Sequence, residues 1–194
     1  MARKSREEAA HTRESITRCA FDLGTSEGME ALSIGRIADE LRMSKSGVAG
    51  HFESKQDLQL AAVDTAADAF TSAVLRVYDR HEPGKDRLRA LMECWLDYVR
   101  DRGEYGGCFL TAAAFEYDDR PGPVRDRVAR VWRRWFRVLA EEAHTAGLNG
   151  ARTVFRLHAV VTEAMWMNQL FDDDRGWALA REAVDDVLRG KRAG

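Results

Sequence analysis

Proline and cysteine are both scarce in this chain of 194 residues. The three prolines lie at positions 83, 121 and 123, so long intervals remain free of a residue that breaks helices. The three cysteines, Cys19, Cys94 and Cys108, are odd in number and form no C-x-x-C pair. This pattern argues against a disulfide framework and against a zinc ribbon. We expect three reduced, buried thiols.

A long apolar run and an excess of one charge are also missing. The longest uncharged apolar stretch, 106–115, is far shorter than the ~20 residues that cross a bilayer, and the start MARKSREEAA has no apolar segment like that of a signal peptide. Thirty Lys and Arg against 32 Asp and Glu give a formal net charge of -2, so any contact with nucleic acid must be local. We expect a cytoplasmic protein without a membrane partner.

Strand signals are lacking, because no run alternates β-branched and polar residues. Between the glycine and proline breaks, apolar residues recur instead at helical spacing. The sequence therefore predicts an all-α fold of about nine helices. Their expected ranges are 5–23, 33–41, 44–51, 54–81, 85–102, 107–117, 123–146, 151–171 and 175–188.

The helices expected at 33–41 and 44–51 are short, consecutive and preceded by a longer helix, which is the order of a helix-turn-helix. Ser33 and Ser44 are suitable N-caps for them. The second helix opens with two small hydroxyls, a cation and a glycine at 44–47, so backbone N–H groups can approach a phosphate closely. An ordinary pair of packed helices is the alternative explanation of the same pattern.

The segment SIGRIADELRMSKSGVAGHF at 33–52, followed by ESKQDL, resembles the DNA-binding domain of tetracycline-repressor-like (TetR) regulators. The resemblance covers about residues 6–68. It depends on the Ile-Ala pair of the first short helix, the Ser-Lys opening of the second, and the Phe-x-Ser-Lys-x-x-Leu stretch that follows. It implies a three-helix DNA-binding domain at 6–68, with the motif at 33–52. A long helix would join this domain to a helical bundle at 69–194 that binds an effector and forms the dimer.

The resemblance also implies which residues contact DNA. Ser33 would contact phosphate at a helix start, Lys55 would contact the DNA backbone, and His51 falls where the family usually has an aromatic phosphate contact. The full expected set is Arg6, Ser33, Arg36, Ser44, Lys45, Ser46, Gly47, His51 and Lys55.

The same segment departs from the family pattern in two places and in its charge. Arg42 replaces the usual turn glycine, and Ala49 stands where a tyrosine is frequent. Residues 1–55 carry nine Lys and Arg against nine Asp and Glu, whereas a DNA-binding domain is usually basic. Local cations must therefore do the binding, including an N-terminal basic arm of Arg3, Lys4 and Arg6.

Aromatic residues are concentrated after residue 90, where all five tryptophans lie. Most should form the core, and the family resemblance places an effector cavity among the same helices. The candidates for its lining each combine an apolar body with a polar group or lie near one: Trp95, Tyr98, Phe115, Trp135, His158 and Trp166. A small effector that is mostly apolar or aromatic would fit them.

The helix expected at 151–171 is apolar nearly all round in its second half, so it must be covered on several sides. The family resemblance places the dimer interface on the last two helices. We place Val161 and Met165 at this interface.

Together these features predict a ligand-responsive repressor that binds a palindromic operator in double-stranded DNA as a homodimer and is released by a small molecule. No catalytic residue, metal ligand or cofactor is expected, and the protein is not expected to be an enzyme. One alternative is a di-iron helical-bundle enzyme, since Glu8-x-x-His11 and Glu141-x-x-His144 have the required i, i+3 spacing. Neither pair has apolar surroundings that would dry and orient a metal. A helical interaction scaffold without DNA binding is a third hypothesis.

Overall fold

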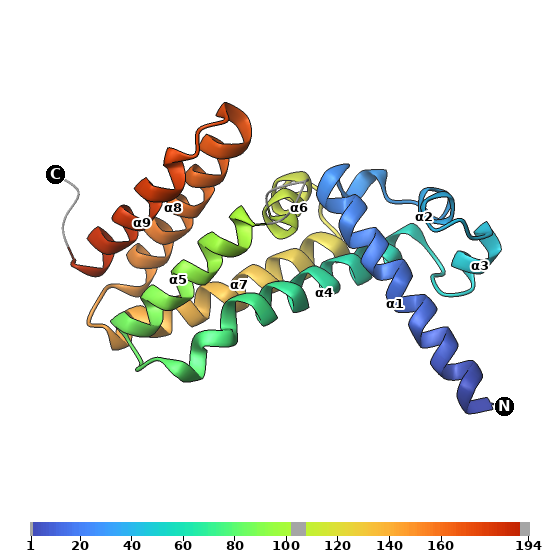
Figure 1. Cartoon of the computed structure of the whole chain (residues 1–194), viewed down its shortest axis with the longest axis horizontal. Coiled ribbons are helices and arrows are strands. Elements are labelled where there is room, and N and C mark those ends of the chain that lie inside the picture. The colour runs from blue at the N-terminus through green and yellow to red at the C-terminus, as the bar shows by residue number, and fades with distance from the viewer. Residues whose placement is uncertain (1, 102–107, 191–194) are drawn as a thin grey trace. The chain divides into compact units, whose positions relative to one another are not determined.

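The computed structural model describes residues 2–101 and 108–190, with side chains from residue 6 onward. Within these ranges every regular element is a helix, which confirms the all-α prediction (Figure 1). Gly107 and the side chains of Arg3 and Lys4 lie outside the described residues. The nine described α-helices are α1 (Ala2–Ser26), α2 (Ile34–Glu40), α3 (Lys45–Ala49), α4 (Lys55–Val74), α5 (Lys85–Arg100), α6 (Phe109–Tyr117), α7 (Pro123–Thr145), α8 (Gly150–Phe171) and α9 (Arg175–Leu188).

Two short 3-10 helices complete this part of the chain: η1 (Met29–Ala31) and η2 (Leu75–Arg80). The prediction of one helix over 54–81 is therefore wrong at its end. The last six residues before His81 wind as η2, the tighter geometry that is frequent at helix C-termini.

The chain divides into two compact units. The first contains residues 1–68 and 108–130, and the second contains 69–107 and 131–194. The helices α4 and α7 contribute residues to both units.

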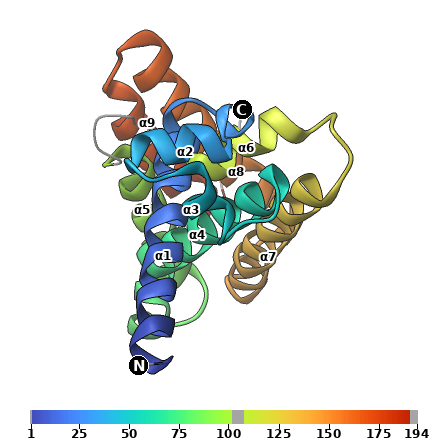
Figure 2. The same ribbon diagram turned by 90° about the vertical axis from the view of Figure 1, so that its right-hand side faces the viewer.

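In the first unit, α2 and α3 contact each other and lie side by side (Figure 2). Both begin at the expected serines: the Ser33 hydroxyl accepts a hydrogen bond from Arg36 N, and the Ser44 hydroxyl accepts one from Gly47 N, each at 3.0 Å. Satisfying an N–H group that has no partner within the helix stabilises such short helices. The apolar side chains Ile37, Val48 and Phe52 are buried beneath this pair.

In the second unit, α8 and α9 lie side by side in Figure 1 and contact each other. Gly176 permits this approach, because a Cβ there would lie 2.9 Å from the Cβ of Met167 and 3.2 Å from the carbonyl oxygen of Ala164. Val161 and Met165 are only 1% and 5% exposed. Placing them on a dimer interface is therefore wrong, because both pack within their own unit.

Candidate nucleic-acid interface and effector site

The exposed start of α3 presents small polar side chains and one cation. Ser44, Lys45 and Ser46 are exposed, and the hydroxyl oxygens of the two serines lie 3.1 Å apart. Gly47 is half-buried and donates its N–H to the Ser44 cap. This edge has no bulky side chain that would keep a phosphate from the backbone. These four predicted residues are contiguous at one end of the helix.

Arg13 of α1 supports the segment that follows α3. Its guanidinium donates to the backbone carbonyl of His51 and lies 4.1 Å from the centre of the Phe52 ring. His51 itself is half-buried, and the predicted contact Arg6 lies exposed on the same helix as Arg13. Arg13 was not predicted from the sequence, because no local spacing connects it to residues almost forty positions away.

Arg36 is held by two carboxylates of the first unit. Its Nη2 lies 2.6 Å from Glu27 Oε1, and its Nη1 lies 2.8 Å from Glu40 Oε2. The hydrogen bond to Glu27 is the main reason that the pKa of the guanidinium is raised above its already high ordinary value, and the hydrogen bond to Glu40 is the second. Both carboxylates would repel a phosphate that approached Arg36. Arg36 is therefore ion-paired within the first unit.

Lys55, at the start of α4, is also paired with an acid. Its Nζ lies 2.6 Å from the backbone carbonyl oxygen of Glu30 and 3.0 Å from the Oε2 of the same residue. Ser33 uses its hydroxyl as the cap of α2. The predicted DNA contacts thus include an open group at 44–47 and three residues, Ser33, Arg36 and Lys55, that have partners inside the unit.

In the second unit, aromatic side chains from α4, α5, α7 and α8 form one cluster. Trp95 and Trp135 meet edge to face with ring centroids 5.4 Å apart, and the His158 ring lies 6.2 Å from Trp95. Tyr98 belongs to the same group, because its ring centroid lies 5.4 Å from that of Phe70. We call these residues, together with Trp132 and Phe136, the aromatic cluster. It contains four of the six predicted effector residues.

Two indole nitrogens inside the aromatic cluster lack a hydrogen-bond partner. The Nε1 atoms of Trp95 and Trp135 are buried without a hydrogen-bond partner, although the two side chains are 1% and 4% exposed. Burial lowers the pKa of His158, so its imidazole is neutral near pH 7. Two donors and one neutral ring thus lie in an apolar setting, where an acceptor atom of a ligand would find partners.

Phe115 and Trp166 do not share this environment. Phe115 lies on α6 in the first unit and is 56% exposed, and Trp166 on α8 is 49% exposed. Trp166 follows the buried Met165, and one residue turns the side chain by about 100° around a helix. Phe70, Trp132 and Phe136 were not predicted as members of the site, because large aromatics at helical spacing have the same sequence pattern in a core and in a pocket.

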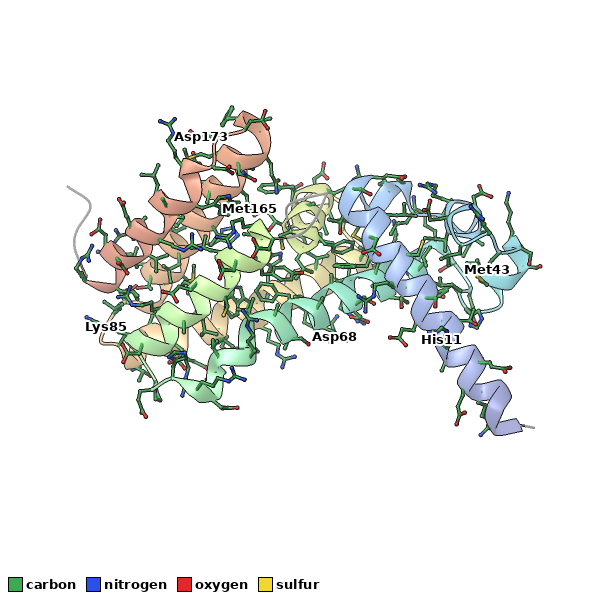
Figure 3. The ribbon with its side chains drawn as sticks, in the orientation of Figure 1. His11, Met43, Asp68, Lys85, Met165 and Asp173 are labelled. Carbon is green, nitrogen blue, oxygen red and sulfur yellow. The ribbon has the colours of Figure 1, made fainter. Side chains whose placement is uncertain are left out.

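The residues of the di-iron alternative lie on the surface. His11 is an exposed side chain of α1 (Figure 3), and Glu8, Glu141 and His144 are exposed as well. Di-iron ligands of helical bundles project inward. Across 2–101 and 108–190 the structure groups no three His, Cys, Asp or Glu side chains that could hold a metal ion. Over the same residues, no helix is long and apolar enough to cross a membrane.

A helix-turn-helix unit joined to a helical bundle is the architecture of a bacterial transcriptional regulator, and comparison with known proteins assigns the family. Residues 16–62 match "Bacterial regulatory proteins, tetR family", and residues 84–184 match "Tetracyclin repressor-like, C-terminal domain". The chain therefore belongs to the TetR family, as the motif at 33–52 predicted.

Individual relatives agree with this assignment. The transcriptional activator FasR of Mycolicibacterium smegmatis is 30% identical over 80 residues, which cover 41% of this chain but only 36% of FasR. SCO4454, a TetR-family regulator from Streptomyces coelicolor, superposes with a TM-score of 0.83 at 25% identity, over 96% of this chain and 94% of its own. AibR, solved with isovaleryl coenzyme A and operator DNA, has a TM-score of 0.69 at 22% identity, over 91% and 96% of the two chains.

Proposed function

We propose that this protein is a cytoplasmic, ligand-responsive transcriptional repressor that binds a palindromic operator as a homodimer and leaves it when a small molecule binds. We assign DNA binding to residues 6–68, and effector binding and dimerisation to 69–194. The observation that carries the proposal is the open edge at 44–47, where a capped helix presents Lys45 and two hydroxyls without a neighbouring acid among its described partners. Within the family, FasR is named an activator, so the direction of regulation is part of the test.

The DNA contacts follow from the two groups of residues described above. We assign Ser44, Lys45, Ser46 and Gly47 to the leading edge that enters the major groove. Arg6, Ser33, His51 and Lys55 are assigned to the phosphates on either side. Arg36 is assigned a structural role, because Glu27 and Glu40 already neutralise it.

We place the effector in the aromatic cluster. Trp95, Trp135 and His158 supply apolar surface, two indole donors and a neutral imidazole. These groups favour a flat, mostly apolar or aromatic molecule that carries a hydrogen-bond acceptor and no positive charge. The fold neighbour AibR is described with isovaleryl coenzyme A and with operator DNA. This supports the proposal that a protein of this fold binds both an effector and DNA.

We place the dimer interface on the exposed apolar side of α8 and α9. Its large side chains are Phe155, Trp166, Leu170 and Phe171 of α8 and Leu179 of α9, which are 49–76% exposed. Exposed apolar side chains gathered on neighbouring helices are typical of a protein interface. A dimer formed there would present two copies of α3 to two half-sites.

The decisive experiment is selection of bound fragments from random double-stranded DNA, followed by salt titration of binding to the recovered sequence. A palindrome supports a symmetric dimer, and recovery of no sequence favours the scaffold hypothesis.

Lys45→Ala should weaken binding and reduce the slope of log affinity against log salt by about 0.9. Arg36→Ala is the matched control: it should lower the melting temperature and leave the slope unchanged. Equal slopes in wild type and Lys45→Ala would contradict the assignment of the leading edge. In a promoter assay, loss of transcription on binding identifies a repressor.

A further inference from the structure

Glu30, in η1, is the centre of a network of charged and hydrogen-bonded side chains within the first unit. Its Oε2 lies 3.0 Å from Lys55 Nζ, its Oε1 accepts a hydrogen bond from the Tyr117 hydroxyl at 2.8 Å, and the same oxygen lies 3.4 Å from Arg120 Nη1. Lys55 Nζ also donates to the Glu30 backbone carbonyl at 2.6 Å. An ammonium has three N–H donors. A single residue therefore occupies two of the three donors of Lys55.

Gln59 and Glu116 hold the backbone around Glu30 in place through hydrogen bonds. The side-chain amide of Gln59 donates to the Met29 carbonyl at 2.9 Å and to the Tyr117 hydroxyl at 2.8 Å, and Gln59 is only 5% exposed. The Glu116 carboxylate accepts the backbone N–H of Met29 at 2.8 Å and that of Glu30 at 2.7 Å. These bonds tie η1 to α4 and to the end of α6, so the backbone of Glu30 is fixed beside Lys55.

We propose that Glu30 acts as a brake on DNA binding, because its carboxylate holds Lys55 in an ion pair that a DNA phosphate must replace. The inference rests on the proposed function and adds a residue that sets the strength of one phosphate contact. A lone ammonium offers its full charge to a phosphate, whereas an ammonium beside a carboxylate offers little net charge. Glu30 would also repel the phosphate directly.

The protonation state of Glu30 agrees with this role. Hydrogen bonds from Lys55 and then Tyr117 lower the pKa of the carboxyl, so Glu30 is ionised at neutral pH. The Tyr117 hydroxyl holds the oxygen that does not face Lys55, and it therefore helps to determine how firmly the carboxylate stays in place. Tyr117 is a positioning residue that acts on Lys55 through Glu30.

The test is a salt titration with a labelled random-sequence DNA duplex and with the selected operator. Glu30→Gln keeps the size of the side chain and removes its charge, and it should tighten binding about two- to fivefold, which is the range an exposed ion pair supports. It should also steepen the salt slope by up to about 0.9, because Lys55 gains a full phosphate contact. Tyr117→Phe should shift both quantities in the same direction by less.

Two controls separate the brake from a general effect of charge. In a Lys55→Ala background, Glu30→Gln should leave the salt slope unchanged, because the cation that Glu30 restrains is gone. Glu53→Gln removes an exposed acid two residues before Lys55 and should change the slope less than Glu30→Gln. Melting temperatures check that each variant is folded.

The outcomes distinguish this inference from the proposed function. If wild-type protein binds neither DNA, the proposed function fails and the brake fails with it. If wild type binds and Glu30→Gln weakens binding or leaves the slope unchanged, only the brake is wrong. The same holds if Glu30→Gln steepens the slope equally with and without Lys55.

Discussion

Glu142 Oε1 lies 3.1 Å from Arg87 Nη1, in an ion pair whose side chains are only 4% and 14% exposed. The other carboxylate oxygen accepts the backbone N–H of Gly84 at 2.7 Å. Gly84 precedes α5 and has a φ of 100°, which a residue with a side chain rarely adopts. One carboxylate of α7 thus fixes both the first turn of α5 and the turn before it.

Removing this carboxylate should be costly. Glu142→Ala leaves the buried Gly84 N–H without its acceptor and leaves the Arg87 guanidinium without its carboxylate but still bonded to the His81 carbonyl, so we expect the free energy of unfolding to fall by about 1 to 3 kcal/mol. The neighbouring Glu141 is exposed, and Glu141→Ala should change stability by less than about 0.5 kcal/mol. Urea unfolding followed by circular dichroism measures both. Equal losses in the two variants would show that the buried pair contributes nothing of its own.

The turn between α2 and α3 contains a strained residue. Arg42 has a φ of 53°, in the left-handed region that costs a residue with a Cβ roughly 1 to 2 kcal/mol. Glycine avoids this cost but has a more flexible unfolded state, so Arg42→Gly should stabilise the protein by about 0.5 to 1 kcal/mol. Asp172, with a φ of 52° after α8, provides a comparison. Asp172→Gly should gain less, since aspartate tolerates this region better. A lower melting temperature for Arg42→Gly than for wild type would show that the backbone of Arg42 is not strained.

Local signals were enough to predict much of this unit from sequence. Ser33 and Ser44 each cap a helix through an atom three residues away, so their roles follow from spacing alone. Arg36 of α2 pairs with Glu27, just after α1, and Lys55 of α4 pairs with Glu30 of η1. Because only the folded chain brings these charges together, the acidic partners of Arg36 and Lys55 could not be predicted from the sequence.

The C-terminal part was less predictable because the second half of α8 is apolar nearly all round. Periodicity identified the helix but could not say which side faces the interior, so Val161 was predicted at the dimer interface and Trp166 in the lining of the effector cavity, whereas Val161 is buried and Trp166 is exposed. Trp95, Trp135 and His158 do meet, since each lies on the inner side of its own helix. Distinguishing core from interface in such a helix requires the positions of its neighbours.

The exposed side of α8 and α9 provides a test of assembly. Leu170 and Leu179 are 68% and 51% exposed, so replacing both with glutamate should leave the fold intact and place charges in the proposed interface. We expect sedimentation to show monomers with wild-type helical content and loss of operator binding. Gln169→Glu adds one charge beside Leu170 and should preserve the dimer more fully. Val161→Asp should unfold the protein instead, because it buries a charge. A stable dimer of the double variant would place the interface elsewhere.

The aromatic cluster should make stability depend on pH through His158. Trp95, Trp132 and Phe136 lie around its ring, and burial lowers its pKa below the ordinary value of about 6.5. The unfolded chain then takes up a proton below about pH 6.5 while the folded chain does not. The free energy of unfolding should therefore fall as the pH drops from about 7.5 to about 5.5.

Comparison of variants isolates this contribution. His158→Gln removes the titrating group, so its free energy of unfolding should decline less over the same interval than that of wild type, even though its stability at pH 7.5 is lower through lost packing. His144→Gln, at an exposed position of α7, should follow the wild-type curve more closely. An effector bound in the aromatic cluster should raise the melting temperature and quench tryptophan emission in wild type, with weaker effects in His158→Gln. Parallel stability curves for wild type and His158→Gln would show that the imidazole is solvated and that the aromatic cluster is not a dry site.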